Sequence, residues 1–232
     1  MSNARDTPVD ASEIRSRVED MFAGKVAQLP DQEMDDLLGI CAEETESELY
    51  ESGLSSDYLQ ERFLYEGTPY ILLRSLFHEL SLSADDILFD LGSGYGRVVF
   101  YAGIVTRAQI IGVEIVPERI ASSLSLRNTL RLERVDFIRA NVLEYEYSRG
   151  TVFFLFNPFT KDTLHKVAQT LEHIANQKHI RIVSVAECAH FFDTLPWLHT
   201  TYTDGQRPFD IRIYRSHLQT ETDAKKHFPF KN

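Results

Sequence analysis

The stretch ILFDLGSGYGRVVF, residues 87–100, decides the fold of this 232-residue chain. Its first part, residues 87–91, is a short apolar run typical of a buried strand. Three glycines follow within residues 92–96, and helix-forming residues continue from Arg97 to Val105. Strand, glycine turn and helix in this order open an α/β fold, because glycine lets the chain turn tightly between the two elements.

The same alternation continues toward the C-terminus. Each further apolar run lacks the polar alternation of a half-exposed strand, and a helix beginning at Pro117 separates the second run from the third. Such runs are typical of parallel strands that helices cover on both faces. We expect strands at residues 87–91, 110–113, 135–138, 152–156 and 180–185, with helices between them.

Two flanking elements complete the expected domain. Residues 198–203 and 209–214 flank the turn sequence DGQRP, which predicts an antiparallel hairpin. Before the first strand, Thr68 and Pro69 predict a helix start, with the threonine hydroxyl as the cap and proline at the first helical position. The predicted fold class is therefore α/β, with a mostly parallel sheet and a C-terminal antiparallel hairpin.

The net charge of −11 is concentrated at the N-terminal end. Eleven acidic residues and no basic one lie between Lys25 and Arg62, whereas the rest of the chain is close to neutral. Apolar residues at helical spacing predict two or three amphipathic helices in this acidic part. We expect a small acidic helical segment at residues 1–61, the α/β domain at residues 62–219 and a polar tail at residues 220–232.

This charge distribution limits the partners. An acidic segment repels phosphate backbones, which argues against a nucleic acid partner; it attracts a basic partner, or it serves only as a solvated helical face. No apolar run is long enough to span a membrane, and the acidic N-terminus differs from a signal peptide, so we expect a cytoplasmic protein. Cys41 and Cys188 lie far apart and are expected to be two buried thiols.

The glycine turn is the expected ligand site, because ligands bind beyond the carboxyl ends of parallel strands. Gly92, Gly94 and Gly96 let the backbone approach a ligand closely, with Ser93 between them, and the following helix presents free N–H groups. By itself, such a loop also fits dinucleotide-dependent dehydrogenases or a simple tight turn.

Two acidic residues favour a different cofactor. Asp90 ends the first strand, where its charge would repel a pyrophosphate but suits an amino group and a sulfonium, which favours S-adenosyl-L-methionine over NAD. Glu114 ends the second strand and can accept hydrogen bonds from both ribose hydroxyls, with Ile115 packing against the adenine. Asn141 and Val142 follow the third strand, where the asparagine amide reaches the adenine edge or forms only a turn.

Five segments carry a resemblance to known enzymes: YEGTP at 65–69, DLGSGYG at 90–96, GVE at 112–114, NPF at 157–159 and RIVS at 181–184. The glycine, GVE and NPF segments resemble the motifs of class I S-adenosylmethionine-dependent methyltransferases. Together the segments most resemble the lysine methyltransferases of the disruptor-of-telomeric-silencing type and their bacterial relatives. The resemblance implies a Rossmann-like sheet, S-adenosyl-L-methionine as cofactor and methyltransferase activity.

The resemblance also implies roles for single residues. In such enzymes the loop before the first helix folds over the methionine end of the cofactor, which implies this role for Tyr65 and Thr68. The motif after the fourth strand lines the acceptor channel, which implies that role for Asn157 and Phe159. Pro158 departs from the lysine enzymes, which have a second asparagine there, and the acidic front segment is the opposite of the basic extensions with which they grip nucleosomal DNA.

These observations together predict methyl transfer to a nitrogen acceptor, and a protein side chain such as lysine is the acceptor we expect first. The Asn157 oxygen and the Pro158 carbonyl would accept hydrogen bonds from the acceptor N–H groups, and Phe159 would pack on its stem. No metal is expected, since no histidine or acid spacing is that of a metal site. Two alternatives are a small-molecule methyltransferase with the front helices as a lid, and a cofactor-binding module without turnover that binds a basic partner.

Overall fold

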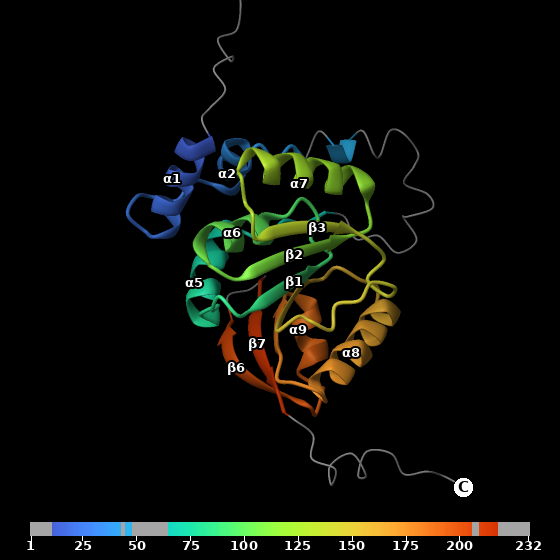
Figure 1. Ribbon diagram of the computed structural model, residues 1–232. Coiled ribbons are helices and arrows are strands. Elements are labelled where there is room, and N and C mark those ends of the chain that lie inside the picture. The colour runs from blue at the N-terminus through green and yellow to red at the C-terminus, as the bar shows by residue number, and fades with distance from the viewer. Residues whose placement is uncertain (1–10, 43–44, 48–64, 206–208, 218–232) are drawn as a thin grey trace, which may run out of the picture.

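The computed structural model describes residues 11–42, 45–47, 65–205 and 209–217. It shows a seven-stranded sheet with helices on both faces (Figure 1). The strands are β1 (Ile87–Leu91), β2 (Gln109–Glu114), β3 (Val135–Arg139), β4 (Val152–Phe156), β5 (Arg181–Val185), β6 (Leu198–Asp204) and β7 (Ile211–Ser216). The helices are α1 (Ala11–Phe22), α2 (Asp31–Leu38), α5 (Tyr70–Leu80), α6 (Arg97–Val105), α7 (Pro117–Thr129), α8 (Lys161–Ala175) and α9 (Glu187–Phe192).

The strand order is β3-β2-β1-β4-β5-β7-β6. Strands β1 to β5 are parallel to one another, whereas β7 runs antiparallel to both β5 and β6. The predicted parallel sheet and closing hairpin are confirmed. Because the chain moves outward from β1 in both directions, the carboxyl ends of β1 and β4 form the switch point at which ligands bind in such sheets.

Two apolar cores lie on the two faces of the sheet. Successive residues of a strand point to opposite faces, so that Leu88 belongs to the core under α5, α6 and α7, whereas Phe89 belongs to the core that α8 covers. Strands β1, β2, β4 and β5 are buried along most of their length, whereas in the edge strand β3 only Val135 and Phe137 are buried. Burial on both faces explains why the strand sequences are continuously apolar.

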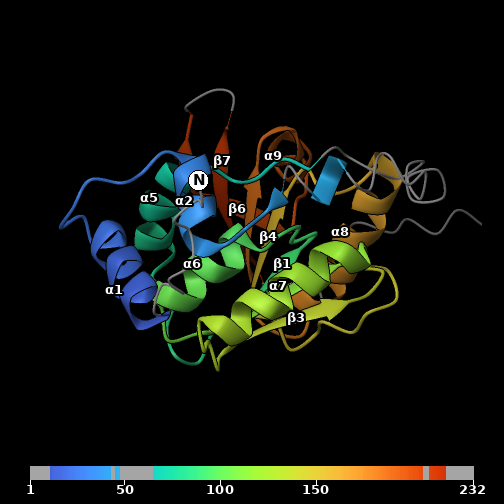
Figure 2. The ribbon, with the colours of Figure 1, turned by 90° about the horizontal axis from the view of Figure 1, so that it is seen from above.

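The front helices α1 and α2 pack beside α5 and α6 (Figure 2). Val18 and Phe22 of α1 belong to the same core as Tyr70 and Tyr101, and the rings of Phe22 and Tyr101 lie 3.8 Å apart. The described part of the front segment thus shares its core with the sheet domain. The boundary at residue 61 stays a prediction.

Two local predictions are wrong. Helix α5 begins at Tyr70 with Pro69 as its N-cap, and Thr68 makes no capping hydrogen bond. The Tyr70 N–H is instead donated to the carboxylate of Asp31 at 3.1 Å, so the cap comes from the front segment. Cys41 is exposed because α2 ends at Leu38, before the apolar face of that helix could include it; Cys188 is buried as predicted.

None of the described helices is long and apolar enough to cross a membrane.

Candidate active site

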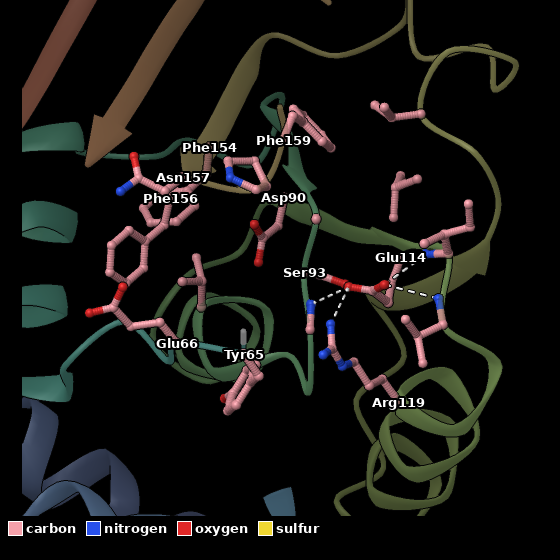
Figure 3. Close-up of a pocket in the computed structure, with 18 of the residues that line it drawn as sticks. Tyr65, Glu66, Asp90, Ser93, Glu114, Arg119, Phe154, Phe156, Asn157 and Phe159 are labelled. Carbon is pink, nitrogen blue, oxygen red and sulfur yellow. Dashed lines mark hydrogen bonds and ion pairs between the residues drawn. The ribbon is translucent and has the colours of Figure 1, made fainter. Parts of the chain in front are cut away.

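A cavity of about 640 Å³ opens beyond the carboxyl ends of β1, β2, β3 and β4 (Figure 3). Nearly all of the predicted site residues line it. These are Tyr65, Thr68, Asp90, Gly92, Ser93, Gly94, Glu114, Ile115, Asn141, Val142, Asn157, Pro158 and Phe159. The topology brings them together because parallel neighbouring strands end at the same edge of the sheet.

The glycine turn is packed tightly between two other parts of the site. Gly92 and Gly94 have φ angles of 88° and 54°, which glycine adopts without strain. A Cβ atom on Gly92 would lie 2.4 Å from the Cβ of Pro158, and one on Gly94 would lie 2.7 Å from the ring of Tyr65. The turn therefore needs glycine for contact with the NPF motif on one side and the tyrosine loop on the other.

Gly96 is the predicted cofactor residue that does not line the cavity. It has a φ angle of 84°, and a Cβ there would lie 2.6 Å from the ring of Phe137 in β3. The glycine therefore allows α6 to begin in close contact with the sheet. Packing alone thus requires glycine at this position, and contact of Gly96 with the cofactor stays a prediction.

Asp90 is buried within the cavity wall, with 4% of its surface exposed. Burial, and secondarily the charge of Glu114, raises the pKa of Asp90 from 3.8 to about 8. Its carboxyl group accepts no hydrogen bond from the described parts of the chain, and the buried Ser93 hydroxyl also has no partner there. Buried polar groups need partners, and the amino group of S-adenosyl-L-methionine has the donors and the positive charge that Asp90 would accept.

Glu114 organises the other end of the cavity. Its carboxylate accepts hydrogen bonds from the backbone N–H groups of Gly94 at 2.9 Å, Ile115 at 2.8 Å and Val116 at 2.9 Å. The guanidinium of Arg119 lies 3.8 Å from the same carboxylate (Figure 3). Glu114 thus ties β2 to the glycine turn, a bond across 20 residues that the sequence pattern did not predict.

The residues expected near the adenine differ in their surroundings. The Asn141 side-chain oxygen accepts the N–H of Leu143 at 3.0 Å, and its amide donates to Glu144 at 3.3 Å. Both polar atoms of the Asn141 side chain thus form hydrogen bonds within the local turn, as expected of a turn residue. Val142 is buried and Ile115 is 43% exposed, and both line the cavity with apolar surface near Glu114.

The NPF motif follows β4 in an unusual backbone conformation. Asn157 has a φ angle of 40°, and its side-chain oxygen accepts the N–H of Cys188 at 2.8 Å. The oxygen expected to face the acceptor thus has a partner at the start of α9, where Ala186 also has a positive φ of 64°. Strain of this kind in non-glycine residues concentrates at functional sites.

Several lining residues were not predicted from the sequence. Arg97 and Arg119 are two cations of the wall, and Glu66 and Phe156 line the cavity on the side of Asn157 (Figure 3). Arg97 directly follows the glycine turn, a position that could have drawn attention. Arg119 carries no such local signal, because its partner Glu46 lies 73 residues away.

The raised pKa of Asp90 gives a pH-dependent prediction. The unfolded carboxyl ionises near pH 3.8 and the folded one near pH 8, so burial of the charge destabilises the fold progressively between these values and fully above them. Asp90→Asn should therefore raise the melting temperature by a few degrees at pH 8.5, and by less at pH 5. Thermal melts at both pH values test this; equal shifts, or equal shifts in the exposed control Asp85→Asn, would contradict it.

Comparison with known proteins identifies the family. Residues 59–191, more than half of the chain, match the family described as "Histone methylation protein DOT1". A protein-lysine N-methyltransferase of Saccharolobus islandicus is 32% identical over 94 residues, which are 40% of this chain. The chain spans 58% of the length of that relative.

Solved structures share the fold. An RNA methyltransferase of Salinibacter ruber, in complex with S-adenosyl-L-homocysteine, matches 67% of this chain and 96% of its own with a TM-score of 0.53 and 21% identity. A putative methyltransferase of Escherichia coli, YhhF, matches 68% of this chain and 92% of its own with a TM-score of 0.57 and 17% identity. The predicted fold and family are confirmed: the chain belongs to the DOT1 histone methylation family of class I methyltransferases, whose cofactor is S-adenosyl-L-methionine.

Proposed function

We propose that this chain transfers a methyl group from S-adenosyl-L-methionine to a nitrogen atom, with the side chain of a protein lysine as acceptor. The observation that carries the proposal is one continuous cavity, in which the buried Asp90 carboxyl and the NPF motif at residues 157–159 share a wall with the glycine turn. A cofactor site and an acceptor site that touch in this way suit direct transfer between the two.

The cofactor half of the cavity supports binding through four groups. Asp90 would receive the amino group, Glu114 a ribose hydroxyl, and the apolar Ile115 and Val142 the adenine faces. A carboxylate offers about four lone-pair positions, and Glu114 already receives three backbone N–H groups. It is therefore held in place before a ribose arrives, which lowers the cost of ordering the site on binding.

The reaction needs mainly alignment and exclusion of water. When bound, S-adenosyl-L-methionine supplies a methyl group on a sulfonium, a good leaving group. The residues of this chain then have to aim a nitrogen lone pair along one line and keep the channel dry. The Pro158 carbonyl is a candidate acceptor for the substrate N–H, and Gly92 allows Pro158 to approach the cofactor turn. The nitrogen that accepts the methyl group releases its proton to solvent.

Charge and aromatic surface on the acceptor side support an amine substrate. The rings of Phe154, Phe156 and Phe159 line this half of the cavity together with the carboxylate of Glu66. Aromatic faces and a carboxylate favour a cationic side chain over a phosphate-bearing one. The protein-lysine N-methyltransferase relative agrees with this acceptor, although it is matched over only 94 residues.

Label transfer tests the proposal. Methyl-tritiated S-adenosyl-L-methionine is incubated with the full chain and a host-cell lysate, which is then separated into protein, nucleic acid and small molecules. Label on lysine in a protein band supports the proposal. Label only in nucleic acid or only in small molecules would mean that the acceptor is not a protein. Cofactor binding without any transfer would favour a cofactor-binding module without turnover.

Asn157→Ala should lower turnover at least tenfold and leave cofactor affinity within about threefold of wild type. The asparagine fixes the NPF turn through its bond to Cys188, and alanine tolerates its positive φ poorly. The measurements are label transfer under saturating cofactor and calorimetric binding of S-adenosyl-L-homocysteine. Asn176→Ala, an exposed asparagine at the end of α8, is the matched control. Parallel losses of turnover and affinity would instead mark Asn157 as a purely structural turn residue.

A further inference from the structure

The acidic front segment reaches the wall of the cofactor cavity at Arg119 as well as at Arg97. Glu46 belongs to a short helical turn at residues 45–47. Its carboxylate receives the Arg119 guanidinium through two hydrogen bonds, from Nε at 2.8 Å and from Nη2 at 3.1 Å. The Arg119 and Glu46 side chains are 8% and 20% exposed, so solvent screens this ion pair only in part.

The same carboxylate contacts the glycine turn itself. The hydroxyl of Tyr95, which lies between Gly94 and Gly96, donates to Glu46 at 3.0 Å. The Tyr95 ring meets the ring of Tyr65 edge to face at a centroid distance of 4.8 Å. Glu46 thus touches the glycine turn directly, and through Tyr95 it supports the tyrosine loop.

Arg119 connects Glu46 to Glu114. Two of its nitrogens serve Glu46, while Nη1 lies 3.8 Å from Glu114. The guanidinium also lies 5.6 Å from the centre of the Tyr65 ring and 5.9 Å from that of Tyr95. One arginine therefore holds together the front segment, the ribose end of the cavity and the two tyrosines beside the turn.

We propose that Glu46 is a positioning residue for the cofactor: by accepting two hydrogen bonds from Arg119, it holds the guanidinium 3.8 Å from Glu114, beyond hydrogen-bond distance, and leaves the Glu114 carboxylate available to the ribose. This inference rests on the proposed role of Glu114 as the ribose acceptor. Without Glu46, the buried guanidinium has Glu114 as its nearest carboxylate and closes on it, competing with the ribose. The acidic front segment is then part of the cofactor site rather than only a solvated face.

Calorimetric titrations on the full chain test this role with two ligands. S-Adenosyl-L-methionine and S-adenosyl-L-homocysteine share the ribose and differ by the positive charge on sulfur. Glu46→Gln should weaken the binding of both by about fivefold to twentyfold and to an equal extent. In turnover assays the same variant should raise the KM for the cofactor and leave kcat within twofold, because the acceptor side is unchanged.

A second substitution and a matched control sharpen the test. In an Arg119→Gln background, Glu46→Gln should cost less than twofold further affinity, since the pair acts as a unit. Glu33→Gln removes an exposed acid from α2 and should change neither affinity by more than twofold.

Three results would overturn the inference and keep the proposed function. The first is an affinity of Glu46→Gln within twofold of wild type, even if its melting temperature is lowered. The second is an equal loss of affinity in Glu33→Gln. The third is a loss of affinity for S-adenosyl-L-methionine alone, which would indicate attraction of its positive charge through space. A wild-type chain that binds neither ligand would overturn the proposed function and this inference together.

Discussion

Glu114→Ala is expected to weaken the binding of S-adenosyl-L-methionine tenfold to a hundredfold, the largest effect on affinity of any single change considered for this cavity. The carboxylate accepts three backbone N–H groups and lies beside Arg119. Its removal takes away the proposed ribose acceptor, releases the Gly94 end of the turn and removes one of the two carboxylates near Arg119. Loss of charge-assisted hydrogen bonds of this kind costs about 1.5–3 kcal/mol.

Isothermal titration calorimetry measures the effect, with circular dichroism to verify that the variant is folded. Glu114→Gln keeps the shape of the side chain and one oxygen, so its loss of affinity should be smaller than that of the alanine variant. Glu133→Ala, at an exposed position before β3, is the control and should bind as wild type does. Unchanged affinity in a folded Glu114→Ala would remove Glu114 from the ribose site.

Asp35→Ala should lower the free energy of unfolding by about 3–5 kcal/mol, the largest stability effect we expect, because it strands a buried cation. The Asp35 carboxylate is 2% exposed. It receives the Tyr70 hydroxyl at 2.8 Å, Arg97 Nε at 2.9 Å and a further hydrogen bond from Arg97 Nη2. The partners left behind are the Arg97 guanidinium, whose side chain is only 12% exposed, and the buried phenol of Tyr70.

Urea denaturation of the full chain gives the free energy difference. Asp36→Ala provides a close control, since Asp36 is the next residue of α2 but is exposed, and its carboxylate receives a hydrogen bond only from Gln32 among the described residues. It should change stability by less than about 0.5 kcal/mol. Similar small effects of both substitutions would mean that Asp31, 3.5 Å from Arg97, replaces Asp35 as the partner of the arginine.

The sheet and its ligand edge could be predicted because their signals are local. Continuous apolar runs at residues 87–91 and 152–156 mark strands that are buried on both faces, and the glycines between strand and helix mark the turn. Since parallel strands end at one edge, the acids that close β1 and β2 had to meet there. The cofactor class follows from these local features, and the family comparison agrees with it.

The contacts between distant segments that support the site could not be predicted in this way. Asp31 caps α5 from 39 residues away, which is why the threonine cap expected within the segment YEGTP was wrong. Similarly, the partner of the Asn157 oxygen lies 31 residues further along the chain. No spacing rule connects such residues, because their distance in space depends on how α2 and α9 pack.

By itself, the sequence determined the order of strands and helices, the glycine turn and the two acids at its flanks, since each depends on neighbours within a few residues. Only the tertiary structure decided that Arg97 and Arg119 are cations of the cavity wall and that Asp35 and Glu46 are their partners. These ion pairs join residues 62 and 73 positions apart. Burial makes them strong by excluding water, and burial is a property of the packed chain rather than of any segment.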